Sequence, residues 1–302
     1  MSDPIIDHCR EVMERGSKTF ARAAALLDPV TRAGAYQLYA WGRHCDDVID
    51  GQILGHGQQT TAPALLEERL ESLRRDTRQA LAGGKPAGPV FEALARVVER
   101  HRIPHHHPFE LLDGMEMDVR GTRYRTIEEL EVYGYRVAGV VAVMMAQVMG
   151  IRDPQTLARA ANVGTAIQLT NISRDVVDDA ANGRVYLPTS WLTEAGVPVD
   201  EVGDPRHRAA VARVVAKVLE RGDQLYRSGD SGFDELPFRS RWAIAAARWI
   251  YWDIGTVIRS RGAAAWDRRA YVGAGKKLYW TVVGFRRAIS RSRAPSRSPA
   301  AP

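Results

Sequence analysis

The sequence is poor in several features that would assign it to other classes of protein. Only two cysteines, Cys9 and Cys45, occur in 302 residues, which excludes a disulfide-rich scaffold and predicts a reducing, intracellular location. The longest apolar run, residues 137–151, is too short to span a bilayer. The N-terminus carries charged residues and has no secretory signal pattern. No Gly-x-Gly-x-x-Gly fingerprint occurs, so the sequence predicts no use of NADPH.

Charge of one sign is also scarce outside the C-terminus. The chain has a formal net charge of +6, and much of it comes from arginines near the end. The rest of the chain is close to charge balance, which argues against a nucleic-acid partner. It also has no basic segments interleaved with aromatic residues, as single-strand binders have. We expect residues 286–302 to be a basic disordered tail. Its arginines are Arg286, Arg287, Arg291, Arg293 and Arg297.

No alternating apolar and polar run indicates a sheet, whereas helical periodicity covers most of residues 1–285. Asp-Pro pairs at Asp3, Asp28 and Asp153 predict helix starts, and Gly51 predicts a helix end. We therefore expect one all-α domain over residues 1–285. The expected helices are 4–15, 20–27, 29–50, 64–81, 90–100, 109–119, 126–149, one from 154 onward, 205–227, 237–261 and 267–289, with a short turn at 190–194.

Two helical segments each carry a polar stripe on an apolar body. At about 3.6 residues per turn, Gln168, Asn171, Asp175 and Asp179 fall on one face. Tyr39, Arg43, Asp46 and Asp50 repeat the arrangement upstream. Buried carboxylates need a partner, and carboxylate with carboxamide is a ligand set that suits Mg²⁺, with Mn²⁺ as a substitute. The predicted metal ligands are Asp46, Asp50, Asn171, Asp175 and Asp179.

Arginines accompany both stripes. Arg43, Arg174 and Arg184 lie within or next to the two segments and could hold phosphate oxygens in bidentate fashion. Metal ions and arginines around one cleft indicate a diphosphate substrate, whose departure a metal ion can assist.

These segments resemble the two aspartate-rich motifs of the squalene/phytoene synthase family of head-to-head prenyltransferases. The similarity extends from Ser17-Lys18-Thr19-Phe20 to Lys276-Lys277-Leu278, and it is strongest to the bacterial phytoene-forming members over LYAWGRHCDDVID, MDVRGTRYRTIEEL, VAGVVAVMMAQVMG and RVYLPTSWL. Departures from the family pattern are Gly42 and Gly134, where many members have cysteine, and Arg136 before Val-Ala-Gly.

The resemblance implies an isoprenoid-synthase-type helical bundle around a central cavity. It implies the condensation of two geranylgeranyl diphosphates, through a cyclopropylcarbinyl diphosphate, to phytoene in carotenoid biosynthesis. The implied catalytic residues are Asp46, Asp50, Asp175, Asp179, Tyr39 and Arg43. The implied substrate-binding residues are Phe20, Tyr39, Arg43, Tyr133, Val137, Gln168, Asn171, Arg174, Arg184, Tyr186 and Tyr251, of which Phe20, Tyr39, Tyr133 and Tyr251 would face an allylic cation.

Alternatives remain open at this point. A squalene or dehydrosqualene synthase would use the same motifs with farnesyl diphosphate, and a longer or shorter cavity would decide between them. Chain-elongating prenyltransferases, terpene cyclases and non-enzymatic assembly factors fit the motif pair less well. Because a C40 product is insoluble in water, we expect a cytoplasmic protein that binds peripherally to the inner face of the membrane through the basic tail. Other carotenoid-pathway enzymes are the expected protein partners.

Overall fold

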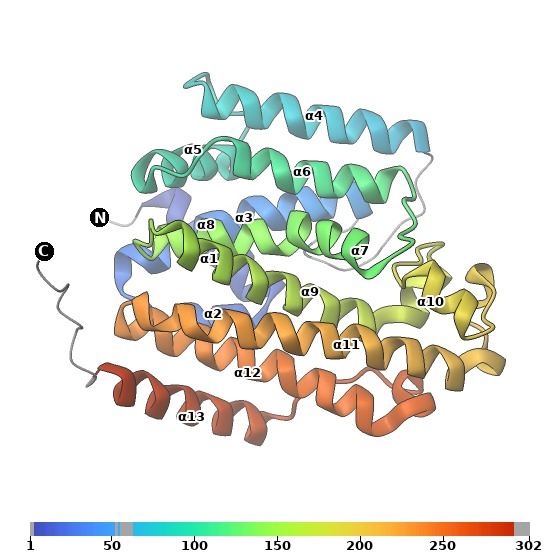
Figure 1. Ribbon diagram of the computed structural model, residues 1–302. Helices are drawn as coiled ribbons and strands as arrows, with labels where there is room; N and C mark the ends of the chain where they lie inside the picture. The colour runs from blue at the N-terminus through green and yellow to red at the C-terminus, as the bar shows by residue number, and fades with distance from the viewer. Residues whose placement is uncertain (1–2, 52–53, 55–62, 293–302) are drawn as a thin grey trace, which may run out of the picture.

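A computed structural model describes residues 3–51, 54 and 63–292, and all regular elements in these ranges are helical. The predicted all-α fold class is confirmed. In Figure 1 the helices lie in layers, with α4 at one edge, α13 at the opposite edge and α9 running through the middle. The helices are α1 Pro4–Gly16, α2 Lys18–Ala24, α3 Pro29–Asp50, α4 Pro63–Leu81, α5 Pro89–His101, α6 His106–Val119, α7 Ile127–Gly134, α8 Val140–Val148, α9 Pro154–Ala181, α10 Thr189–Glu194, α11 Arg208–Asp230, α12 Phe238–Arg261 and α13 Ala274–Ser292; a π-helical turn, η1, covers Tyr135–Gly139, and short 3₁₀ turns are η2 Val199–Glu201, η3 Pro205–His207, η4 Ser231–Glu235 and η5 Gly262–Trp266.

The Asp-Pro pairs begin the helices that carry the two motifs. Oδ1 of Asp28 accepts hydrogen bonds from the backbone N–H groups of Val30 and Thr31, both at 3.1 Å. Oδ2 of Asp153 accepts from the N–H of Thr156 at 2.7 Å. Each cap satisfies backbone donors that a helix start leaves without partners. The predicted starts at residues 29 and 154 are therefore confirmed.

Several of the expected helix bounds differ from the structure, among them 20–27, which is Lys18–Ala24, and 205–227, which is Arg208–Asp230. Helix α6 begins at His106 and not at 109, so part of the histidine-rich connector is helical. The expected helix over residues 126–149 is confirmed as a helical run from Ile127 to Val148, and the sequence did not predict the π-helical turn at Tyr135–Gly139 within it. Helix α13 begins at Ala274 and not at 267, and it continues to Ser292, so residues 286–292 are not a disordered tail. Ala288 is fully buried, which shows that packing holds this helix beyond residue 285. The remaining tail, residues 293–302 with Arg293 and Arg297, lies outside the described residues.

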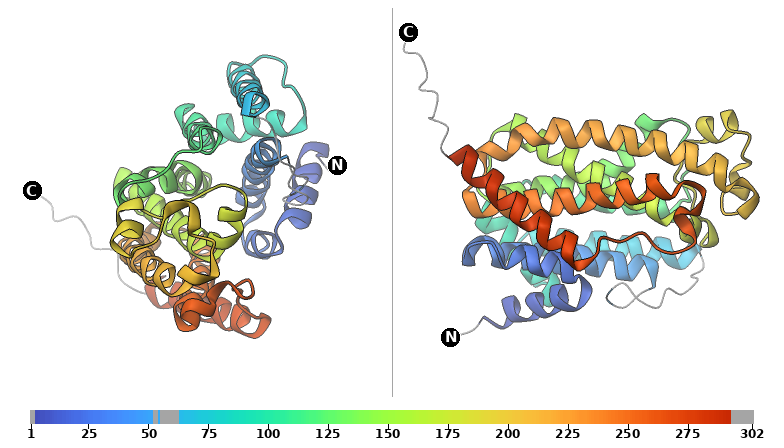
Figure 2. Two further views of the ribbon diagram at one scale, coloured as in Figure 1. Left: turned by 90° about the vertical axis from the view of Figure 1, so that its right-hand side faces the viewer. Right: turned by 90° about the horizontal axis from the view of Figure 1, so that it is seen from below.

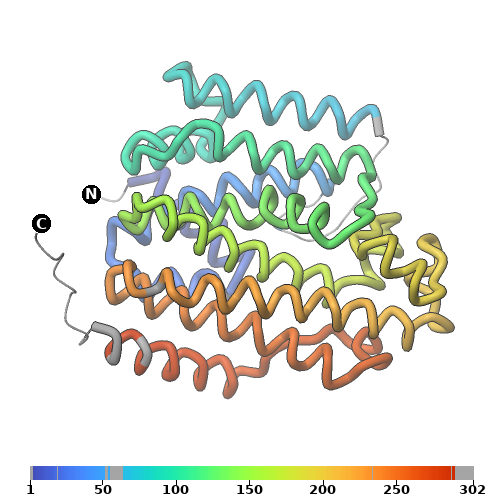
Figure 3. Tube along the Cα trace, in the orientation of Figure 1, coloured from blue at the N-terminus to red at the C-terminus, as the bar shows by residue number. Residues whose placement is uncertain are grey.

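Helix α9 organises the interior. It packs against η1 and α8 on one side and against α11 and α12 on the other (Figure 3). Its crossing with the π-helical turn is close, because a Cβ atom added at Gly164 would lie 2.5 Å from the carbonyl oxygen of Ala138. A second group of buried side chains joins α3, α5, α6 and α8. The two aspartate-bearing helices, α3 and α9, thereby stand on different sides of the space described next.

Candidate active site

The two aspartate motifs meet in space, although they are far apart in sequence. Asp46 and Asp50 lie in the last turns of α3, and Asp175 and Asp179 lie in the last turns of α9. Nη2 of Arg184, just after α9, donates a hydrogen bond to Oδ1 of Asp50 at 2.7 Å. This ion pair joins the ends of both helices at one place.

Asp118 of α6 is a further carboxylate of this group, and sequence reasoning missed it. Tyr133 donates a hydrogen bond to its Oδ2 at 2.9 Å, and Tyr186 donates to its Oδ1 at 2.7 Å. The two tyrosine rings stack with centroids 5.1 Å apart. The signal was its position in the family-like segment MDVRGTRYRTIEEL, but no sequence spacing relates Asp118 to the two motifs.

The carboxylates hold an excess of negative charge. Burial raises the pKa of Asp46 to about 7, and the charges of Asp50, Asp47 and Asp118 add to the effect against the opposing charge of Arg43. The Asp46 side chain is 45% exposed and lines the cavity described below. Burial likewise raises the pKa of Asp179 to about 7, with Asp175 as the next cause.

The pKa of Asp118 is raised to about 6, again chiefly by burial, while Arg184 and the two tyrosine hydroxyls oppose the shift. A cluster in which three acids resist ionisation is one that bound cations would stabilise.

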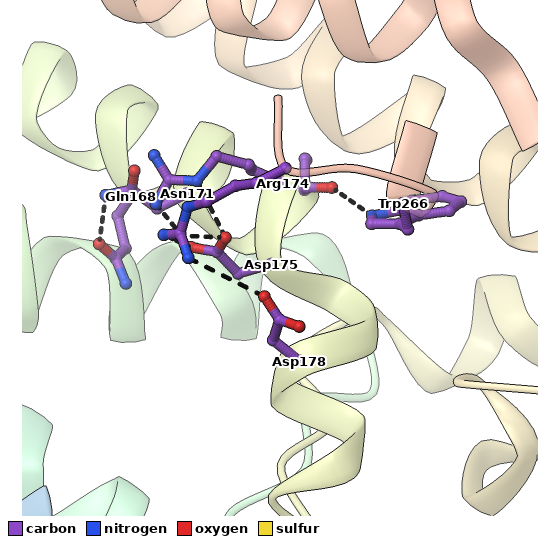
Figure 4. A network of polar contacts seen from close by, with 8 residues as sticks. Gln168, Asn171, Arg174, Asp175, Asp178 and Trp266 are labelled. Atoms are coloured by element: carbon purple, nitrogen blue, oxygen red, sulfur yellow. Dashed lines mark hydrogen bonds and ion pairs between the residues drawn. The ribbon is translucent and has the colours of Figure 1, made fainter. Parts of the chain in front are cut away.

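Asp175 is shared by two arginines (Figure 4). Arg174 donates to it through Nε at 2.9 Å and Nη2 at 2.5 Å. Arg269, in the segment before α13, donates from Nη2 to Asp175 at 3.2 Å and lies 3.9 Å from Asp178. Arg269 was not predicted, because nothing in the sequence connects residues 267–273 with α9. Both guanidinium groups are near the entrance of the cavity that they help to line.

A cavity of about 620 Å³ extends from this charged region into the bundle. Its deep walls are apolar and come from α8, α9 and α12, with Met145, Ala160 and Ile244 among them. The predicted residues that line it are Phe20, Tyr39, Arg43, Asp46, Val137, Gln168, Asn171, Arg174 and Tyr251. The phenyl and phenol rings of Phe20 and Tyr39 lie 5.9 Å apart on the same wall.

The other predicted residues are not part of the cavity lining. Asp50, Asp175, Asp179 and Arg184 belong to the carboxylate and arginine cluster described above. Tyr186 and Tyr133 form the tyrosine pair on Asp118. The expectation that the Tyr133 ring lies along the cavity is wrong, because its ring is packed between Tyr124 and Tyr186. Arg136 also lies off the cavity, with Nε 3.5 Å from Glu110.

The donor set suits a hard divalent cation. Oδ1 of Asn171 is buried and has no hydrogen-bond partner among the described residues, so this carboxamide oxygen is available as a ligand. Within the described ranges, no three His, Cys, Asp or Glu side chains are close enough to form a ready-made metal site. The carboxylates are therefore spread around a cleft, an arrangement suited to ions shared with an anionic substrate.

We expect the metal-free protein to be more stable at pH 6 than at pH 8. Asp46, Asp118 and Asp179 have raised pKa values in the folded state, against about 3.9 for an unfolded aspartate. The folded state then holds more protons than the unfolded state, so the free energy of unfolding falls as the pH rises through about 4 to 7. Thermal unfolding in EDTA measures the difference, which Asp46→Asn should reduce. A higher melting temperature at pH 8 would contradict the expectation.

Known proteins resemble this chain along nearly all of its length. A sequence model described as squalene/phytoene synthase matches residues 13–276. The phytoene synthase of Pseudescherichia vulneris is 44% identical over 91% of this chain and 89% of its own. The 15-cis-phytoene synthase of Pantoea ananas is 43% identical over 99% and 98%, respectively. A solved dehydrosqualene synthase in complex with a ligand is 25% identical, with a TM-score of 0.84 over 95% of this chain and 97% of that one.

Proposed function

The chain belongs to the squalene/phytoene synthase family, and we propose that it joins two geranylgeranyl diphosphates head to head to give phytoene and diphosphate. It has the all-α isoprenoid synthase fold and is an enzyme of the prenyltransferase class. One observation supports the substrate class above all. Asp46, Arg43, Arg174 and Arg269 line one part of a cavity of about 620 Å³ whose other walls are mostly apolar, as a diphosphate with a long hydrocarbon chain requires.

The family is one of divalent-metal-dependent prenyl diphosphate enzymes, and we propose Mg²⁺, with Mn²⁺ as a substitute, as the ion in this chain. Asp46, Asp50, Asn171, Asp175 and Asp179 would hold it. When bound, such ions neutralise the diphosphate and favour its departure from the allylic carbon.

The arginines bind and orient the same diphosphate. Nη1 of Arg43 lies 3.7 Å from Asp46 and 3.8 Å from Asp47. Arg174 and Arg184 are held by Asp175 and Asp50, and these carboxylates could exchange them for ions when substrate arrives. The freed guanidinium groups would then bind phosphate oxygens in bidentate fashion.

The cavity walls protect the reactive carbon. After the first donor ionises, its allylic cation must be kept from water until the second donor alkylates it. Phe20, Tyr39 and Tyr251 line the cavity and can stabilise positive charge through their ring faces. The cyclopropylcarbinyl diphosphate formed in this way ionises in turn, rearranges and loses a proton to give phytoene.

Dehydrosqualene synthesis from farnesyl diphosphate is the second candidate, favoured by the similarity to a solved dehydrosqualene synthase. Incubation with each prenyl diphosphate and Mg²⁺, with and without NADPH, separates the two. We expect phytoene from the C20 donor and no effect of NADPH. A C30 product made from farnesyl diphosphate in preference would support the second candidate. A reduced C30 product that requires NADPH would indicate squalene synthesis.

We propose that the enzyme works in the cytoplasm, bound peripherally to the inner face of the membrane, where later carotenoid-pathway enzymes can receive its product. The part of the chain that the structure describes has no helix with the length and apolar character of a membrane span. We further propose that the catalytic unit is one domain, and that it ends with α13 at Ser292 and not at residue 285.

A further inference from the structure

Helix α13 has an exposed apolar surface on the outside of the bundle. Leu278, Tyr279, Val282 and Phe285 are 66%, 57%, 45% and 38% exposed, respectively. Their spacing of one, four and seven residues keeps them on one side of the helix, and we call these four residues the α13 face. In Figure 2 (right) the helix crosses the outside of the bundle, and no other described element covers it.

Most of the α13 face is left out of the packing of the bundle, although the Phe285 ring lies 5.1 Å from that of Trp242 on α12. The opposite side of the helix already packs against α12, where Trp280 stacks on Trp249 with centroids 5.1 Å apart and Ala288 is fully buried. Nζ of Lys276 also lies 3.0 Å from the buried carboxylate of Asp253. Four large apolar side chains on the outer side therefore represent a contiguous surface for something outside the chain.

Helix α13 and the chain after it carry basic side chains and no acidic ones. Arg286 is exposed at the C-terminal end of the apolar stripe, whereas Lys276 before its N-terminal end is paired with Asp253. No aspartate or glutamate follows Asp267 in the sequence, while lysines and arginines continue to Arg297. A partner surface that combines an apolar layer with negative charge, as an anionic lipid bilayer does, complements both properties.

The α13 face also adjoins the apolar end of the cavity. The ring of Phe285 lies 5.8 Å from that of Phe238, which is 37% exposed at the start of α12. Leu236, two residues earlier, lines the cavity, as do Ile244 and Ala247 on the side of α12 turned away from α13. A single helix thus separates the α13 face from the space proposed to hold the hydrocarbon chains.

We propose that the α13 face is the surface by which this enzyme docks on an anionic lipid bilayer. Leu278, Val282 and Phe285 enter the boundary between headgroups and acyl chains, and Arg286 lies against a lipid phosphate. Docking in this orientation brings the cavity end at Leu236 near the membrane, where an apolar product can leave; this last clause rests on the proposed function.

Vesicle flotation of the full chain tests the docking surface. The vesicles are phosphatidylcholine with or without phosphatidylglycerol, and the variant is Leu278→Ser with Val282→Ser. We expect its partition coefficient to fall about tenfold or more, because two apolar side chains lose their burial. The matched control, Leu65→Ser with Val132→Ser, removes side chains that are 42% and 50% exposed on α4 and α7 and should bind as wild type. Arg286→Gln should weaken binding to anionic vesicles about fivefold.

Fluorescent labelling of a single introduced cysteine shows which position meets the membrane. The two native cysteines are fully buried, so the label attaches to the introduced one. An environment-sensitive fluorophore on Val282→Cys should shift to the blue with vesicles, and one on Val132→Cys should not. Equal flotation of both double variants, or no shift at residue 282, would overturn the proposal. Light scattering that shows a wild-type dimer dissolved by Leu278→Ser with Val282→Ser would make the α13 face a self-interface and overturn it as well.

The proposed reaction is tested separately in detergent-dispersed substrate, where the Leu278→Ser and Val282→Ser variant should keep wild-type turnover. Vesicle binding through the α13 face without phytoene formation would leave the docking surface standing and remove the proposed function. Phytoene formation without vesicle binding through the α13 face would support the proposed function and overturn the docking surface.

Discussion

Replacement of any one of Asp46, Asp50, Asp175 or Asp179 by alanine is expected to remove most turnover, on the order of a hundredfold or more. Each carboxylate belongs to the cluster that would hold the metal ions and, through them, the leaving diphosphate. Circular dichroism should show nearly unchanged helical content. Without divalent cations the melting temperature of Asp46→Ala and Asp179→Ala should stay equal or rise, because these two acids have pKa values raised to about 7 and their removal relieves repulsion. That of Asp50→Ala and Asp175→Ala should fall, because Arg184 loses its partner in the first variant and Arg174 and Arg269 share that loss in the second.

Asp178→Ala provides the matched control. Its side chain is 69% exposed on the same turn of α9, and only the 3.9 Å contact with Arg269 is lost. Turnover should remain close to wild type. Wild-type rates in two or more of the four cluster variants would show that the reaction does not depend on this cluster.

Ala160→Phe is expected to suppress turnover of the C20 donor far more than that of the C15 donor. Ala160 lines the cavity eleven residues before Asn171 on α9, roughly 16 Å along the helix axis. A phenyl ring there would occupy the space of the last isoprene unit of a geranylgeranyl chain, while a farnesyl chain would still fit. The ratio of the two kcat/KM values should shift on the order of a hundredfold toward the C15 donor.

Ala158→Phe is the control for the second prediction, because Ala158 is exposed on the same helix. Product analysis and kcat/KM for both donors, measured with each variant, give the comparison. An equal loss with both donors would indicate damage to the fold or to the charged end. Undiminished phytoene formation would mean that the chains do not reach this part of the cavity.

The sequence by itself determined the features that depend on local chemistry and on helical period. Asp28 and Asp153 cap helices whichever tertiary structure follows, so the starts of α3 and α9 could be predicted. The spacing within each motif places Asp46 with Asp50, and Asp175 with Asp179, because the α-helix has a fixed period. The resemblance to a known family then supplied the cavity, and most of the residues expected along it do line it.

Only the tertiary structure decided which distant groups meet. Asp118 joins the two motifs because α6 packs beside α3 and Tyr186 follows α9, and its hydrogen bond with Tyr133 holds that ring off the cavity lining. Arg269 reaches Asp175 across 94 positions of sequence. The π-helical turn at Tyr135–Gly139 and the continuation of α13 to Ser292 follow from packing against α9 and α12. Periodicity and capping describe a residue's neighbours along one helix, whereas these features depend on contacts between helices, which no local pattern encodes.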